Sequence, residues 1–195
     1  MTGMALEGSF FRGHLVPPFV GLKPSTKILL YELVSYDYVS SPRSHQRKGY
    51  SFPGNDALAR WTGFSESTVK RGLTELEHLL YIVRHREYRG RGHRDYRFAY
   101  INYPKLVRGH EFVLKARQRR NHKDLETLES ECSARMQTDD VSFLARLFND
   151  RTITSSELAT TVESSYLRSN RRLISELSMR VEGLNLAPSK KDCRT

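Results

Sequence analysis

The segment from Asn55 to Leu80 constrains the fold more than any other part of this chain. Its apolar residues follow a helical period on both sides of Thr62-Gly63-Phe64, where the pattern breaks. Gly63 can adopt the positive φ that a tight turn between two helices requires. Asn55 can cap the first helix and Ser65 the second, because short polar side chains accept hydrogen bonds from free backbone N–H groups. We therefore predict two short helices joined by a tight turn.

The second of these helices has two faces. One stripe is aliphatic and should be buried: Val69, Leu73, Leu76 and Leu80. Another stripe combines short polar and basic side chains: Ser67, Lys70, Arg71 and Thr74. A helix held by its apolar face can place such a polar face in the major groove of DNA, although a solvated surface has the same pattern. On the first helix, Trp61 lies on the apolar face, and we expect it in the core.

Further elements are predicted on both sides of this segment. Apolar spacing indicates a helix over Ser25–Tyr38, and Tyr50–Phe52 is a candidate short strand. After Leu80 the period changes to that of strands, at Tyr81–Tyr88 and Asp95–Ile101, around a turn that contains Gly90 and Gly92. The fold class we expect is α+β: three helices plus a β-hairpin wing, followed by a mostly α-helical C-terminal region.

Positive charge is concentrated in one part of the chain. The net charge is +10, and residues 84–120 contain 12 Lys and Arg residues against 3 Asp and Glu. Six arginines lie at positions 84, 86, 89, 91, 94 and 97 of the predicted hairpin. Such a patch favours polyanions, so nucleic acid is the first partner to consider. The arginines of the hairpin have an alternative explanation, because charged side chains also protect exposed strand edges from pairing with other chains. The basic segment Lys115–Arg120 is equally compatible with a phosphate contact or a solvated face.

The region after Pro104 is predicted to be helical. Glu111–Gln137 is a highly charged helical stretch, Val141–Phe148 is predicted to form a short amphipathic helix, and Asp139-Asp140 is typical of a helix start. Ser156–Leu177 faintly echoes a helix-turn-helix, without a well-placed glycine. We predict an arm over residues 1–22, a DNA-binding domain over 23–104, a helical region over 105–187 that could oligomerise, and a disordered tail over 188–195.

Several classes of protein are not supported by the sequence. Cys132 and Cys193 lie far apart, and His85 and His93 have no partners at metal-ligand spacing, so we expect neither disulfide nor metal. No stretch has the length and hydrophobicity of a signal peptide or of a membrane span. Nucleotide-binding and hydrolase motifs are absent. We expect a soluble cytoplasmic protein that is not an enzyme and has no cofactor.

The order of predicted elements, with Leu58-Ala59, Gly63, Ser65, Val69 and Leu73, resembles the bacterial winged helix-turn-helix proteins. Plasmid- and phage-encoded regulators and replication proteins carry such domains, and GntR-like repressors resemble the chain more distantly. The resemblance implies that Ala59 lets the two helices approach and that Val69 and Leu73 hold the recognition helix on the core. The chain departs from the family at Leu79-Leu80-Tyr81, where a glycine commonly opens the first wing strand.

DNA contacts are expected from two sets of residues. On the recognition helix they are Ser65, Ser67, Thr68, Lys70, Arg71 and Thr74, and on the wing they are Arg86, Arg89, Arg91 and Arg94. The leading hypothesis is a transcriptional regulator, in particular a repressor, that binds double-stranded DNA as a dimer. Residues 110–185 are expected to form the contact between the two copies. A plasmid or phage replication protein, and a winged-helix module that binds proteins, remain alternatives.

Overall fold

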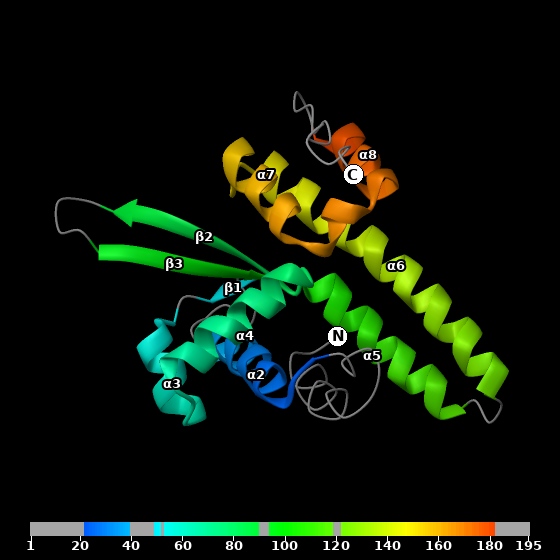
Figure 1. Cartoon of the computed structure of the whole chain (residues 1–195), viewed down its shortest axis with the longest axis horizontal. Helices are drawn as coiled ribbons and strands as arrows, with labels where there is room; N and C mark the ends of the chain where they lie inside the picture. Colours follow the sequence, from blue (N-terminus) through cyan, green and yellow to red (C-terminus); the bar gives the residue numbers. More distant parts are fainter. Residues whose placement is uncertain (1–21, 40–48, 52, 90–93, 119–121, 182–195) are drawn as a thin grey trace, which may run out of the picture.

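In the part of the chain that the structure describes, helices and strands are interspersed up to Ile101, and the elements after it are helices (Figure 1). The computed structural model describes residues 22–39, 49–51, 53–89, 94–118 and 122–181. Its elements, in chain order, are α2 (Pro24–Val39), β1 (Tyr50–Ser51), α3 (Asn55–Thr62), α4 (Glu66–His78), β2 (Ile82–Arg89), β3 (Arg94–Ile101), α5 (Tyr103–Gln118), α6 (His122–Asn149), α7 (Ser155–Ser164), the 3₁₀ helix η2 (Tyr166–Ser169) and α8 (Arg171–Arg180).

This order confirms the predicted fold class, an α+β arrangement of helices and a small antiparallel sheet followed by a helical region. The expected arm, apart from Leu22, and the expected tail lie outside the described residues. The division into domains therefore stays a prediction. None of the helices in the described ranges combines the length and the apolar composition that a membrane crossing requires.

Helices α2, α3 and α4 pack around a first hydrophobic core. Leu29 and Leu33 of α2, Leu58 of α3 and Leu76 of α4 are all buried in it. Helix α4 approaches α2 closely at Gly72, where an added Cβ would lie 2.4 Å from Leu29 Cδ1. A glycine in the middle of a helix lowers its stability, so its presence here is explained by this close contact.

The sheet lies between this first core and a second one. It is antiparallel with strand order β1-β3-β2, and Val83 of β2 pairs with Tyr100 of β3. Because side chains alternate along a strand, Ile82 packs into the first core while Val83 packs into the second. Figure 1 shows α2, α3 and α4 on one side of the hairpin base and α7 and α8 on the other.

The helical region begins with two long helices, α5 and α6, that pack against each other and extend away from the sheet (Figure 1). Helix α6 has 28 residues and contains Val141–Phe148, so the expectation of a separate short helix there is wrong. Asp139 and Asp140 lie inside α6, which also corrects their interpretation as a helix start. They pair with Arg108 and Lys105 of α5, and this tertiary pairing explains why two acids occur in the interior of a helix.

Candidate nucleic-acid interface

The turn between α3 and α4 has the geometry that the sequence predicts. Gly63 has a φ of 71° and ends α3 in the left-handed conformation. Ser65 caps α4, because its Oγ accepts a hydrogen bond from the Thr68 backbone N–H at 3.3 Å. The expected cap of α3 is different: Asn55 is the first helical residue, and Gly54 occupies the cap position without a side-chain hydrogen bond.

The polar face of α4 is exposed along its length. Five of the six predicted recognition residues are exposed and Thr68 is half-buried; the exposed ones are Ser65, Ser67, Lys70, Arg71 and Thr74. The aliphatic stripe on the opposite side, Val69, Leu73, Leu76 and Leu80, is buried as predicted. The helix is therefore fixed through one side, and its other side is exposed to solvent.

Local contacts hold these side chains only weakly. Lys70 Nζ lies 3.5 Å from Glu66 Oε2, and both side chains are more than half exposed, at 61% and 58%. An exposed pair of this kind contributes at most about 1 kcal/mol, so a phosphate can replace the carboxylate. Arg71 Nε donates to the carbonyl oxygen of Ser67 at 3.4 Å, which leaves the other guanidinium N–H groups for a ligand.

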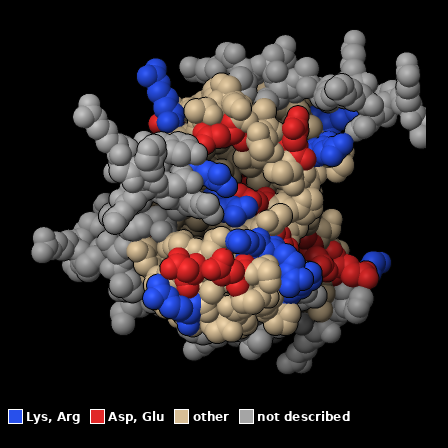
Figure 2. Space-filling view, turned by 60° about the vertical axis from the view of Figure 1, so that its left-hand side comes forward, with Lys and Arg blue, Asp and Glu red and all other residues tan. Residues whose placement is uncertain are grey.

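The predicted wing residues extend along the hairpin. Arg86 is exposed on β2, and the backbones of Arg89 and Arg94 form the last pair of the β2–β3 register. Arg91 lies outside the described residues. Arg84 donates to Glu77 at the end of α4, so this arginine of the hairpin is engaged within the protein. Figure 2 shows Lys and Arg side chains in several groups with acidic side chains beside them.

Trp61 is not in the core, contrary to expectation. Its side chain is 48% exposed and stacks on Tyr36 of α2, with ring centroids 5.4 Å apart and planes inclined by 25°. Helix α3 has only eight residues and buries Leu58 alone, which leaves Trp61 at the edge of α2. The helical pattern of the sequence could not distinguish this edge position from a central one, because it reports the face and not the depth of cover.

Leu80 lies in the stretch where the resemblance to winged helix-turn-helix proteins leads us to expect a glycine. Its φ is 55°, and the Leu80 and Tyr81 N–H groups donate to the carbonyls of Glu77 and Leu76, an arrangement that ends α4 as a Schellman motif. A leucine in this conformation is strained by about 1 kcal/mol or more. Its side chain is fully buried in the second core, and this burial offsets the strain.

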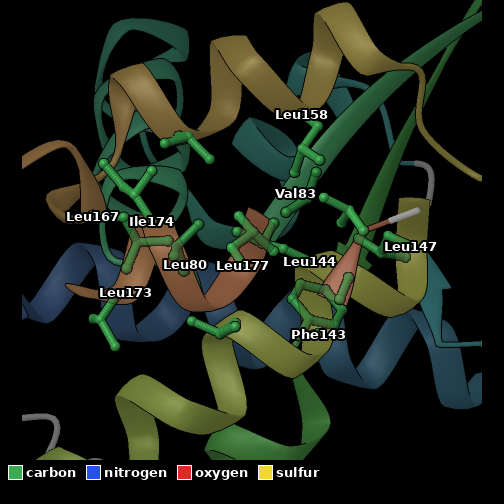
Figure 3. Packing of buried hydrophobic residues seen from close by; sticks show 14 of the residues in the cluster. Leu80, Val83, Phe143, Leu144, Leu147, Leu158, Leu167, Leu173, Ile174 and Leu177 are labelled. Carbon is green, nitrogen blue, oxygen red and sulfur yellow. The ribbon is translucent and has the colours of Figure 1, made fainter. Parts of the chain in front are cut away.

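The second core surrounds Leu80 with residues of α6, η2 and α8. Figure 3 shows Leu80 close to Leu173, Ile174 and Leu177. Full burial of a leucine side chain contributes about 1.5–3 kcal/mol, which exceeds the backbone strain. The residue that follows the C-cap of α4 is thus also a core residue of the helical region. The sequence shows a leucine where a glycine is expected, but it does not reveal the hydrophobic residues that pack around this leucine and stabilise it.

Two polar side chains hold the carbonyl groups at the end of α4. Lys105 Nζ donates to the Leu79 carbonyl at 2.5 Å, and Asn102 Nδ2 donates to the Leu80 carbonyl at 3.0 Å. Both side chains also donate to Asp140 of α6, at 2.7 Å each. Asp140 therefore holds in place Asn102 and Lys105, the two side chains that bind the carbonyl groups at the end of α4.

Asp140 is fully buried and satisfied by several donors. Besides Asn102 and Lys105, the Tyr166 hydroxyl donates to Asp140 Oδ2 at 2.5 Å. Burial raises the pKa of Asp140 to about 6, although Lys105 and Tyr166 act in the opposite direction. Sequence reasoning missed this cluster, since its members come from separate segments of the chain.

Comparison with known proteins agrees with this geometry. Residues 20–82 match a family model described as a helix-turn-helix domain. The match covers α2, α3 and α4, which is less than half of the chain, and a helix-turn-helix domain in this part supports DNA binding. No curated protein and no solved structure matches the chain.

Proposed function

We propose that this protein recognises specific sequences in double-stranded DNA by placing α4 in the major groove. The observation that carries the proposal is the exposed row of Ser67, Lys70, Arg71 and Thr74 on a helix whose other side is buried. Arg71 is the best candidate for a base contact, because a guanidinium can donate two hydrogen bonds to guanine. Lys70 is suited to a phosphate.

The remaining site residues would position the domain on DNA. Ser65 and Thr68 lie at the start of α4, where hydroxyl and backbone N–H groups can bind phosphate. Arg86, Arg89, Arg91 and Arg94 would contact flanking phosphates or the minor groove. Contacts of this second type add affinity for any sequence, whereas the middle of α4 supplies the preference.

We also propose that binding regulates transcription, with the protein acting as a repressor that occupies promoter DNA as a homodimer. Residues 110–185 are the proposed dimer region. In support, Leu114 of α5 is 48% exposed, and Leu125 and Leu128 of α6 are only half-buried. Apolar side chains in such positions gain from contact with a second copy.

The test is selection of bound duplexes by the full chain from a pool of random sequence, followed by gel shifts in increasing KCl. We expect an enriched sequence and an affinity that falls steeply with salt, because bound phosphates release counterions. Absence of any enrichment, or binding that is insensitive to salt, would contradict the proposal and favour a protein-binding module. Sites at promoters support repression, whereas repeats within a replication origin support the replication alternative.

A further inference from the structure

The helical region contains a second pair of short helices joined by a turn. Helix α7 begins with a capping box, in which Thr154 Oγ1 accepts from the Glu157 N–H at 3.3 Å and Glu157 accepts from the Thr154 N–H at 2.8 Å. Asn170 caps α8 by accepting from the Leu173 N–H at 3.2 Å. The faint echo in the sequence thus corresponds to two helices, and η2 provides the turn in place of a glycine.

The exposed and buried positions of α8 repeat those of α4. In α4 the exposed residues Lys70, Arg71 and Thr74 flank the buried Leu73 and Leu76. In α8 the exposed residues Arg171, Arg172 and Ser175 flank the buried Ile174 and Leu177 at the same intervals. Each helix therefore turns two basic side chains and one hydroxyl outward while aliphatic side chains hold it down.

The preceding helices correspond as well. Leu158-Ala159 occupies the place on α7 that Leu58-Ala59 occupies on α3, and both leucines are buried. The connection from this dipeptide to the first basic residue is one residue longer in the second pair. The similarity therefore extends over both helices of each pair, which a chance arrangement of charges on one helix would not produce.

Arg171 and Arg172 have no ion-pair partner among the described residues, and the first turn of α8 contains no acid. Arg180 near the end of the same helix differs, because it pairs with Glu176 at 2.6 Å and donates to Ser142. Cations at the start of a helix oppose the helix dipole and cost up to about 1 kcal/mol each. An anionic ligand would remove this cost, so the two arginines fit a phosphate surface.

Helices α4 and α7 are fastened to each other. His78 Nδ1 at the end of α4 lies 2.9 Å from the Ser164 carbonyl oxygen of α7. His85 Nδ1 on β2 lies 2.6 Å from Glu157 Oε1, also on α7. With Leu80 and Asp140 bridging the same two regions, the second helix pair has a fixed position relative to α4.

We propose that α8 is a second DNA-contacting helix, in which Arg171 and Arg172 bind backbone phosphates of the duplex that α4 reads. The inference rests on the proposed function, since DNA is the ligand in both. The contact supplies affinity without sequence preference and lengthens the stretch of duplex that the protein covers.

The experiment compares the full-length parent with Arg171→Ala/Arg172→Ala on the duplex recovered by selection. The control Arg135→Ala/Arg146→Ala removes the same charge from exposed positions of α6 to which no DNA contact is assigned; both positions lie in the proposed dimer region, so the oligomeric mass of every variant is measured as well. We expect the slope of log affinity against log KCl to fall by about 2 per bound protomer for the α8 variant, at about 0.9 per phosphate contact, and to stay near the parental value for the control. The protected stretch in a hydroxyl-radical footprint should shorten in each half-site of the bound dimer.

Charge rescue and folding controls make the outcome decisive. Arg171→Lys/Arg172→Lys should keep the parental slope, because phosphate contacts require charge more than shape, and thermal melts should show that all variants fold. A parental slope and footprint for the α8 alanine variant would overturn the inference, as would a change in oligomeric mass in place of the slope change. If Arg71→Ala impairs binding in the same assay, only the inference has failed; if the parent binds no duplex, the proposed function fails with it.

Discussion

Arg71 lies in the middle of the exposed face of α4, with only a long hydrogen bond to the helix backbone. If it contacts a base, Arg71→Ala should weaken binding to the selected sequence by about 1–3 kcal/mol, roughly 5- to 150-fold, and relax the preference at one base pair. Fluorescence anisotropy with the selected duplex and with single-base variants measures both effects.

Arg135→Ala is the matched control, because Arg135 is an exposed arginine on α6 to which no DNA contact is assigned. It lies in the proposed dimer region, so its oligomeric mass is compared with that of the parent. It should bind like the parent. An Arg71→Ala protein that keeps the parental affinity and the parental preference at every base pair would remove Arg71 from the site.

Asp140 links stability to pH. Its pKa is raised from 3.8 to about 6 in the folded protein, so its contribution to the free energy of unfolding is complete below pH 3.8. The contribution is lost as the pH rises through 6, because a buried carboxylate must then carry charge. At about 1.4 kcal/mol per pKa unit the loss is on the order of 3 kcal/mol.

Urea denaturation of the parent and of Asp140→Asn between pH 4 and 7 tests this. The variant lacks the carboxyl group, so the stability advantage of the parent over it should shrink as the pH rises. An advantage that grows over the same range would show that the donors around Asp140 outweigh its burial.

Helix α4 depends on a close approach to α2. In Gly72→Ala the new Cβ would meet Leu29, and overpacking costs about 1–3 kcal/mol against a gain of about 1 kcal/mol in helix propensity. We expect a net loss of about 1 kcal/mol in the free energy of unfolding. In a Leu29→Val background, which removes the clashing Cδ1 atom, the same change should cost less; equal costs in both backgrounds would refute the contact as the cause.

The hairpin permits a similar comparison within one strand. Arg86 is exposed, whereas Arg84, two positions earlier on the same face, is paired with Glu77. Arg86→Ala should weaken binding to specific and unrelated duplexes equally and lower the salt slope by about 1. Arg84→Ala changes the charge by the same amount without removing a phosphate contact, so its slope should stay parental. Equal slopes for the two variants would exclude a role for Arg86 in phosphate binding.

Over the whole molecule, the sequence predicted those features of the fold that depend on residues close together in the chain. The turn at Gly63, the cap at Ser65 and the two faces of α4 follow from residue types within one or two helical turns. Trp61 and the Asp139-Asp140 pair were misinterpreted, because their surroundings come from α2 and α5. Local rules place acids at a helix start and apolar side chains in a core, but contacts between distant segments decided both cases.

The sequence predicted which residues of α4 belong to the candidate site, but not the contacts that hold the neighbouring residues in place. The residues on α4 could be named because groove-reading side chains follow the helical period. The pairing of Arg84 with Glu77 and the fastening of Leu79 and Leu80 by Lys105 and Asn102 could not, since neither follows a period. The assignment of individual residues to DNA contacts stays a prediction.

The left-handed backbone conformation of Leu80 affects where this chain can be truncated. A fragment that stops after the hairpin would keep the strained backbone of Leu80 but lose the aliphatic cover over Leu80 and Val83. Two large hydrophobic side chains would then be exposed to water at the end of α4. A fragment of the first hundred residues is therefore not suited to fusion with another protein by itself. The fusion would have to include the C-terminal helices or place a glycine at position 80.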